Sequence, residues 1–364
     1  MLRWCLRRGF ARSGCLERRR MQRVVVFSES SFTISGHGVH TAFVECQHIT
    51  DQMPSMQREI LWNLKPTDIL HVHSAGPVAM ALLLYHTGPK VITAHITPES
   101  FMGSIVNADF LQTPIEGYLR SFYMRADLVL AVSSYAFDYL QGIHIPRIRL
   151  MPNTVDCQAL SRLRESRLDL REKLGFKHAR PVIVSVGQIQ PRKGIYDFIH
   201  TARTMPDADF VWVGGFLFGP LSADRTRLRQ IIASAPANAI FTGQVSRTSV
   251  LKYCAAADIF VSFSNQETFG LAILEAAAVG LPLVLRDLSL YRSVFDESYV
   301  SVDDRDFRTA IASLIYDEQK HAMYSSRAKA IAKRYNSSIY ETELLDAYSE
   351  ASRLAGRRLG NTLL

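Results

Sequence analysis

The chain has 364 residues, of which 48% are hydrophobic and 21% are charged. This is the composition of a folded globular protein, and the length suits two domains of ordinary size. No window contains the roughly 18 to 20 uncharged apolar residues that a membrane-spanning helix needs, and the longest apolar stretch, residues 75–85, predicts a buried helix. The five cysteines lack CxxC spacing, which argues against a disulfide framework or a zinc site and favours a reducing compartment.

The net charge of +8 is concentrated in residues 1–20, which contain seven arginines and one glutamate. Three interpretations of this basic tail are open. It resembles an organellar presequence, it could be an arm for an anionic lipid surface, or it is not translated because synthesis starts at Met21. The body of the chain has no basic stripe with interleaved aromatic residues, so nucleic-acid binding is not expected.

Short β-branched runs alternate with helical patterns along the chain, which is typical of βαβ units on parallel sheets. The expected strands lie at residues 23–27, 68–73, 90–95, 127–133 and 148–152, and then at 181–187, 209–215, 239–243, 258–264 and 281–286. We therefore expect an α/β fold with one Rossmann-like domain over residues 21–153 and a second over 154–335. Ligands of such sheets bind beyond the carboxyl ends of the strands, which places a site in the cleft between the two halves.

Two glutamates flank a glycine in the otherwise apolar sequence ETFGLAILE, which begins at Glu267. A helix is predicted to follow an N-cap at Thr268, with Gly270 in its first turn, where free backbone N–H groups favour phosphate. Glu267 would lie beside that phosphate and Glu275 about 10 to 12 Å away, about the span from the sugar to the ribose of a nucleotide-sugar. Alternatively, Glu267 is a solvated loop residue and Glu275 pairs with Arg286.

A second candidate site follows the expected strand 181–187. Gly187 ends this strand, and Arg192 and Lys193 precede Gly194 at the start of the next helix. An arginine and a lysine beside a glycine at a strand exit suit a diphosphate, because arginine gives a forked contact and lysine a point charge. The alternative is an ordinary pair of surface cations, since the sequence is not a GxxxxGK[ST] loop.

The first half of the chain offers further candidates. The glycine-rich turn at residues 36–38 would permit positive φ and close backbone approach to a ligand, unless it is simply a tight turn. His95, at the end of the strand 90–95, would face the cleft, unless it is a structural histidine. His71 and His73 are expected on opposite faces of their strand, so that this HxH pair lacks a third metal ligand.

Together, ETFGLAILE, PRKG, MPNTVD and His95 resemble the family 4 retaining glycosyltransferases of the GT-B fold, and the resemblance covers most of residues 22–350. The stretches VGQIQPRKGIYDFI, FVWVGGFLFG, FTGQVSR and LVLRDLSLYRSVF look more closely like bacterial glycosyl-diacylglycerol synthases. The resemblance implies two Rossmann-like domains that face each other across a cleft, with the C-terminal helix, residues 336–364, packing back on the N-terminal domain.

The resemblance also implies a role for each candidate residue. Glu267 would contact the donor sugar and stabilise positive charge at its anomeric carbon, Lys193 would neutralise the departing diphosphate, and His95 would meet the sugar near its 6-position. The other expected donor-binding residues are Arg192, Gln188, Gly187, Phe269, Gly270, Leu271 and Glu275, the last of them on the ribose. Gly36, His37 and Gly38 would border the phosphate and the acceptor. Gln188 is a departure, because many family members have arginine there.

The implied reaction is the transfer of a hexose from UDP-glucose or UDP-galactose to diacylglycerol or a glycosyl-diacylglycerol. Retention would come from front-face attack, with the protein supplying positioning and electrostatic stabilisation. No metal or cofactor is expected, because Arg192, Lys193 and a helix N-terminus supply the positive charge.

The implied location is cytoplasmic, on the inner face of the cell membrane as a peripheral protein. Expected contacts with the anionic lipid surface are Phe101, Met102, Arg120 and Arg125, unless that segment packs on its own domain. Two other functions stay open: transfer to a polysaccharide or lipid-linked glycan, and a catalytically silent GT-B binding module.

Overall fold

The computed structural model describes residues 21–33, 38–100, 112–216, 224–303 and 306–362. These residues form two six-stranded parallel sheets, ordered β2-β1-β3-β4-β5-β6 and β12-β11-β10-β7-β8-β9. The first sheet consists of β1 (Gln22–Phe27), β2 (Met56–Arg58), β3 (Ile69–Val72), β4 (Lys90–Ala94), β5 (Leu128–Ala131) and β6 (Ile148–Leu150). The second consists of β7 (Val182–Val186), β8 (Asp209–Val213), β9 (Ala239–Phe241), β10 (Ile259–Ser262), β11 (Leu283–Arg286) and β12 (Val300–Val302). The predicted pair of Rossmann-like sheets is confirmed.

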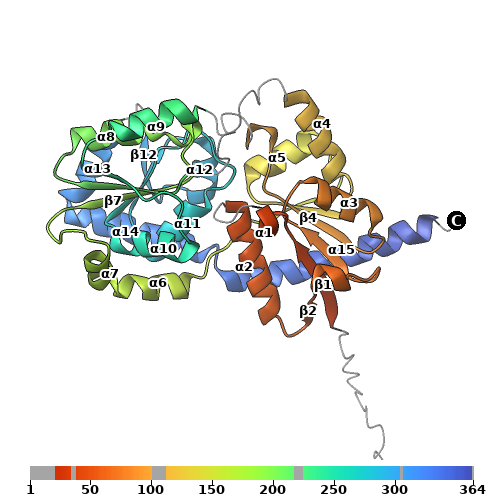
Figure 1. The fold of residues 1–364 in the computed structure, drawn as a ribbon. Coiled ribbons are helices and arrows are strands. Elements are labelled where there is room, and N and C mark those ends of the chain that lie inside the picture. The colour runs from red at the N-terminus through yellow and green to blue at the C-terminus, as the bar shows by residue number, and fades with distance from the viewer. Residues whose placement is uncertain (1–20, 34–37, 101–111, 217–223, 304–305, 363–364) are drawn as a thin grey trace, which may run out of the picture.

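Helices cover both faces of each sheet (Figure 1). Those of the N-terminal half are α1 (Ser30–Thr33), α2 (Gly38–Gln52), α3 (Pro77–Tyr85), α4 (Gln112–Tyr123) and α5 (Ser134–Gly142). Those of the C-terminal half are α6 (Cys157–Glu165), α7 (Arg167–Lys173), α8 (Ile195–Thr204), α9 (Arg225–Ala233), α10 (Arg247–Ala256), α11 (Leu271–Val279), α12 (Ser289–Phe295), α13 (Phe307–Ile315) and α14 (Glu318–Lys333). Short 3-10 turns include η1 (Leu61–Asn63), η2 (Pro98–Ser100) and η4 (Pro191–Lys193).

The chain passes between the two halves twice, and the two passages lie side by side. Val155 forms a parallel bridge with Asn336, and the Thr154 hydroxyl donates to the Tyr335 carbonyl at 2.7 Å. The second passage leads into α15 (Ser337–Thr362), which runs beneath the N-terminal sheet (Figure 1). Tyr348 of this helix is fully buried, and its hydroxyl lies 2.9 Å from Nδ1 of His71 on β3. The expectation that the C-terminal helix packs back on the first domain is confirmed.

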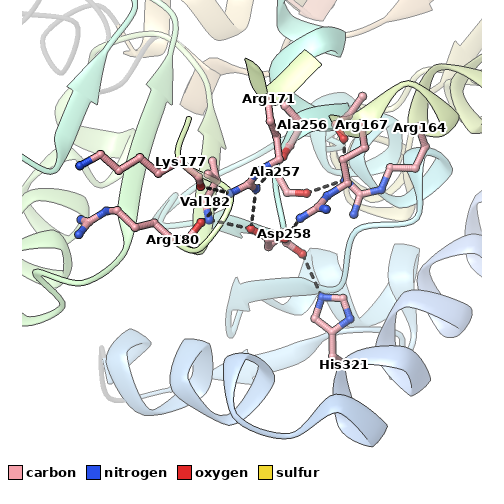
Figure 2. A network of polar contacts seen from close by, with 11 residues as sticks. Arg164, Arg167, Arg171, Lys177, Arg180, Val182, Ala256, Ala257, Asp258 and His321 are labelled. Atoms are coloured by element: carbon pink, nitrogen blue, oxygen red, sulfur yellow. Dashed lines mark hydrogen bonds and ion pairs between the residues drawn. The ribbon is translucent and has the colours of Figure 1, made fainter. Parts of the chain in front are cut away.

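One carboxylate anchors α6 and α7, the helices after the first passage, and it does so by binding them to the second sheet. Asp258, directly before β10, forms ion pairs with Arg167 and with Arg171, the latter at 3.0 Å, and accepts a hydrogen bond from the Val182 backbone at 2.8 Å (Figure 2). Arg164 donates from the same side to the carbonyls of Ala255 and Ala257. This network fixes α6 and α7 to the amino-terminal edge of the sheet, away from the carboxyl ends where the candidate site lies.

Two strands, β2 and β12, were not predicted. Each has only three residues and lies at the edge of its sheet. The β2 sequence, MQR, contains no β-branched run that would predict a strand. An edge strand is paired with a neighbour on one side only, so its sequence need not be apolar.

Two sequence expectations about the N-terminal half were wrong. Of the nine residues of α3, only Ala79 and Leu83 are buried, so this apolar helix lies at the surface. His71 on β3 and His73 directly after it point to the same side, with ring centroids 4.4 Å apart, because side chains two residues apart point the same way in extended backbone.

Candidate active site

The candidate donor residues come from two loops at the carboxyl edge of the second sheet. One loop follows β7 and contains η4, and the other joins β10 to α11. The two strands are neighbours in the sheet, with Ile183 opposite Ile259. The backbone N–H of Asn265 donates to the Arg192 carbonyl at 2.8 Å, so the loops are tied together directly.

Lys193 and Glu267 meet where these loops touch. Nζ of Lys193 lies 2.5 Å from Oε1 of Glu267, and the Ser264 hydroxyl donates to the same oxygen at 3.0 Å. Both side chains are largely buried, at 13% and 16% exposed. Arg192 adds a second cation nearby and donates to the Gln266 carbonyl at 3.3 Å. The sequence expectation that Glu267 could be a solvated loop residue is wrong.

The two cations keep the Glu267 carboxylate ionised. Burial alone would raise the pKa of Glu267, but the charges of Lys193 and Arg192 hold that pKa below the ordinary carboxyl value. Burial lowers the pKa of Lys193, and Glu267 opposes this shift. The cluster therefore combines two cations with one carboxylate, which leaves positive charge for an anionic ligand.

Two glycines make this arrangement possible. Gly194 has φ of 78° and ends η4, and a Cβ there would lie 2.1 Å from the Phe263 carbonyl oxygen. Gly270 has φ of 90° and forms the N-cap of α11. The helix therefore begins at Leu271, and the prediction that Thr268 is the N-cap was wrong. Thr268 instead faces the other domain, because its carbonyl accepts a hydrogen bond from the Ser133 hydroxyl at 2.7 Å.

Glu275, the fifth residue of α11, is buried and pairs with an arginine that the sequence did not single out. Nε of Arg247, the first residue of α10, lies 3.2 Å from Glu275, and its Nη1 lies 3.1 Å from Glu45 on α2 of the N-terminal half. The expected alternative partner, Arg286, binds Asp197 and the Phe263 carbonyl instead. Arg247 therefore links the two halves of the chain through Glu275.

The ionisation of this triad follows from burial and charge. Burial raises the pKa of Glu275, and Arg247 offsets only part of that rise. Burial alone would lower the pKa of Arg247, but Glu275 and Glu45 raise it above the ordinary value. The arginine stays charged, so loss of either carboxylate leaves a half-buried cation with only one partner.

His95 follows β4 and is 8% exposed. Its Nε2 lies 3.1 Å from Nδ1 of His73, so one of the two ring nitrogens donates a hydrogen bond to the other. His71 lies deeper in the domain. Its Nδ1 contacts the Tyr348 hydroxyl, and its Nε2 lies 2.7 Å from the Thr93 hydroxyl. A chain of buried polar side chains thus runs from α15 to His95.

One cluster among the described residues has the composition of a metal site. Ligand atoms of Cys46, His71 and His73 lie within 4.8 Å of one another. Both nitrogens of His71 already have hydrogen-bond partners, and burial raises the pKa of the Cys46 thiol to about 12. We interpret the cluster as a hydrogen-bonded part of the core.

The remaining predicted residues divide into three groups. Gly187 packs under the Lys193 stem, its carbonyl accepts from Trp212 Nε1 at 2.9 Å, and Gln188 accepts from Gln190 at 2.6 Å. The Phe269 ring is buried and contacts Tyr335 edge-on. Gly38 begins α2 with nothing within 4 Å of an added Cβ, so Gly38 does not use the positive φ that a glycine would permit there. Gly36, His37, Phe101 and Met102 lie outside the described residues.

Arg120 and Arg125, two of the expected membrane contacts, are exposed, and Arg120 donates to the Ile143 carbonyl at 3.1 Å.

Arg247, Glu45 and His73 are the partners that sequence reasoning missed. Arg247 lies in the stretch FTGQVSR, which carried the resemblance, but its role depends on a contact with an element about 200 residues away. No local pattern reports such a contact.

A fold of two facing Rossmann-like sheets with this cluster at the carboxyl ends of the second sheet defines a GT-B glycosyltransferase. The chain matches the families described as "Glycosyl transferases group 1" over residues 166–331 and "Glycosyltransferase Family 4" over residues 14–159. It therefore belongs to the family 4, group 1 glycosyltransferases, which use nucleotide-sugars.

Curated relatives extend over nearly the whole chain. An alpha-galactosylglucosyldiacylglycerol synthase of Streptococcus pneumoniae is 30% identical over 336 residues, which is 90% of each chain. A processive diacylglycerol alpha-glucosyltransferase of Acholeplasma laidlawii is 26% identical over 340 residues, 91% of this chain and 99% of the relative. Anabaena HepE, solved in complex with UDP-glucose, has a similar fold, with a TM-score of 0.70 and 18% identity over 90% of this chain and 99% of that one.

Proposed function

We propose that the protein transfers a hexose from a UDP-sugar to diacylglycerol or a glycosyl-diacylglycerol, with retention of the anomeric configuration. The observation that carries the proposal is the buried cluster of Lys193, Arg192 and Glu267 beside the N-terminus of α11. The acceptor class is supported by the two relatives whose names specify diacylglycerol glycolipids.

In this mechanism the two cations receive the donor diphosphate. Lys193 and Arg192 would neutralise the charge that develops on the leaving group, together with the first backbone N–H groups of Leu271 and its neighbours in α11. Because these cations come from the chain itself, the proposal includes no metal ion.

Glu267 would exchange part of its contact with Lys193 for the donor sugar. Its ionised carboxylate then stabilises positive charge at the anomeric carbon while the acceptor hydroxyl attacks from the face that the diphosphate leaves and gives its proton to the departing phosphate oxygen. Glu275, held by Arg247, would accept hydrogen bonds from the ribose hydroxyls. His95 would contact the sugar from the N-terminal half, with its hydrogen position set by His73.

The acceptor requires the enzyme to work at a lipid surface, and we place it as a peripheral protein on the cytoplasmic face of the membrane. Among the described residues, no helix combines the length and the apolarity needed to cross a bilayer. Incubation with radiolabelled UDP-glucose or UDP-galactose over diacylglycerol-containing vesicles tests the proposal. Labelled glycolipid supports it, whereas label transferred only to a polysaccharide or lipid-linked glycan favours that other acceptor, and no turnover of any donor favours a silent binding module.

A further inference from the structure

Two elements of the N-terminal half each hold a buried polar atom that has no hydrogen-bond partner among the described residues. The atoms are Oε2 of Glu99, in η2, and the hydroxyl oxygen of Tyr139, on α5. A buried polar atom without a partner costs free energy, so such atoms are rare in folded proteins. Both side chains are only half-buried as a whole, which means that they border solvent. A ligand that reaches this border and hydrogen-bonds to both atoms would remove the cost.

The elements that hold these atoms face the loop of Glu267. Ser100, the last residue of η2, has its hydroxyl oxygen 3.4 Å from that of Thr268. Ser133, the N-cap of α5, donates from its hydroxyl to the Thr268 carbonyl at 2.7 Å. The residue that follows Glu267 is therefore in contact with both η2 and the start of α5.

Tyr135, one turn before Tyr139 on α5, contacts the residue on the other side of Glu267. Burial and the charge of Glu99 raise the pKa of Tyr135, and hydrogen bonds, one of them with the Gln266 side chain, act in the opposite direction. The acceptor hydroxyl must reach the anomeric carbon that Glu267 would stabilise. We therefore place Glu99 and Tyr139 on the acceptor side of that carbon.

The two atoms require complementary partners. Burial raises the pKa of Tyr139, and the carboxylates of Glu116 and Glu99 raise it further, so the Tyr139 hydroxyl stays protonated and can donate. An ionised carboxylate oxygen such as Oε2 of Glu99 can only accept. Hydroxyl groups both donate and accept, and a sugar presents several of them on one ring.

This chemistry distinguishes the two acceptors that the proposed function leaves open. Bare diacylglycerol has a single hydroxyl, and in the proposed mechanism that hydroxyl gives its proton to the departing phosphate oxygen. It therefore has no proton left for Glu99, and the carboxylate oxygen would stay unpaired. A glycosyl-diacylglycerol carries further hydroxyls beside the one that reacts, and these can hydrogen-bond to Glu99 and Tyr139.

We propose that Glu99 and Tyr139 form an acceptor-sugar subsite, which binds the hexose hydroxyls of a glycosyl-diacylglycerol and selects this lipid over bare diacylglycerol. The inference rests on the proposed function and narrows its acceptor to a lipid that already carries a sugar. The subsite orients that sugar across from Glu267 and takes no part in the proton transfer.

Acceptor kinetics of the full-length protein test the selection. We expect Glu99→Gln to reduce kcat/KM for a hexosyl-diacylglycerol by about 10- to 100-fold, mostly through the KM of the acceptor, because a charge-assisted hydrogen bond is lost. Tyr139→Phe should cause a smaller loss, about fivefold. The Kd for UDP, measured by calorimetry, should stay at the wild-type value. Wild-type kcat/KM of Glu99→Gln, a weakened Kd for UDP, or a wild-type preference for bare diacylglycerol overturns the proposal.

Glu116→Gln is the matched control. Glu116 is an exposed carboxylate that also raises the pKa of Tyr139, so the variant removes the same charge without removing a buried oxygen. Its acceptor kinetics should match those of wild type. A loss equal to that of Glu99→Gln would show that net charge matters rather than contact with Glu99, and would contradict the subsite.

Saturation-transfer NMR separates the subsite from the proposed function. The probes are methyl glucoside and methyl galactoside, each added with saturating UDP, and we expect transfer to one of them in wild type that is lost in Glu99→Gln. Such Glu99-dependent binding without glycolipid formation from any donor refutes the proposed function and keeps the subsite. Equal transfer in both proteins places the glycoside elsewhere, and no transfer in either shows that no sugar binds there. Either result refutes the subsite, even where glycolipid is formed.

Discussion

Nζ of Lys193 and Oε1 of Glu267 lie 2.5 Å apart, although the residues are 74 positions apart in the chain. The pair joins the loops after β7 and β10, and Lys193 lowers the pKa of Glu267 although burial acts to raise it. A donor that brings its own diphosphate can replace the carboxylate as the partner of Lys193, which would free Glu267 to face the sugar.

Replacing Glu267 by glutamine should reduce the rate of transfer by about 100- to 1000-fold, because electrostatic stabilisation of the developing charge is lost. Lys193→Met should cause a loss of similar size, since the diphosphate loses its point charge. Steady-state transfer of labelled hexose measures both effects.

The matched control for this pair is Asp209→Asn, which breaks the ion pair with Arg180 at 2.8 Å on the same domain, away from the cluster. Its transfer rate should stay near that of wild type. Wild-type turnover by Glu267→Gln would contradict the role assigned to this carboxylate.

Arg247 should affect donor binding more than turnover. Arg247→Ala removes the cation that holds Glu275, so we expect the KM for the UDP-sugar to rise by roughly tenfold, the cost of one charge-assisted contact, with a smaller change in kcat. Glu45→Gln removes only the link to the N-terminal half and should raise that KM less. If the two variants have equal KM values, Arg247 acts through domain contact and not through Glu275.

Gly194→Ala should destabilise the protein by about 3 kcal/mol or more, because a Cβ at φ of 78° would also lie 2.1 Å from the Phe263 carbonyl. Gly356→Ala is the control: this helical glycine of α15 has nothing within 4 Å of an added Cβ, and alanine there should be neutral or stabilising by up to about 1 kcal/mol. Urea denaturation measures the free energies of unfolding. A Gly194→Ala protein as stable as wild type would show that η4 and the loop after β10 can move apart.

The free energy of unfolding should fall as the pH is lowered from 7 to 5. Burial lowers the pKa of His71 to about 3 and that of His73 well below the ordinary value. The folded state therefore leaves both rings neutral while the unfolded state binds protons below about pH 6.5, and stability is lost on acidification. Two such groups give a slope of up to about 2.7 kcal/mol per pH unit.

Denaturation of His71→Gln across the same pH range checks this assignment. The variant should show a shallower dependence, since one of the two neutral histidines is gone. An unchanged slope would contradict the assignment to His71, because other carboxylates or histidines would then have to account for the loss of stability at low pH.

The sequence was sufficient for the fold and for the elements that carry the candidate site. Alternation of β-branched and helical stretches located ten strands, and the edge strand β2 escaped because its sequence, MQR, has no β-branched residue. Local sequence also placed Lys193 and Glu267 in loops after two strands, and they meet because those strands, β7 and β10, are neighbours in the sheet.

What the sequence could not predict depends on contacts between distant elements. The alternative partner that the sequence offered for Glu275 was Arg286, but the packing of α10 against α11 brings Arg247 to Glu275 instead. The apolar stretch of α3 predicted burial because composition does not report how many neighbours a helix has, and this chain leaves its outer face exposed.

The most direct test of the central claim is a transfer assay with radiolabelled UDP-glucose and UDP-galactose on vesicles that contain diacylglycerol, or diacylglycerol already carrying a hexose. We predict labelled glycolipid with an α-linked sugar, formed by the wild-type protein and reduced by about 100-fold or more in Glu267→Gln. Donor turnover without any labelled lipid, or labelled lipid formed equally by both proteins, would contradict the account.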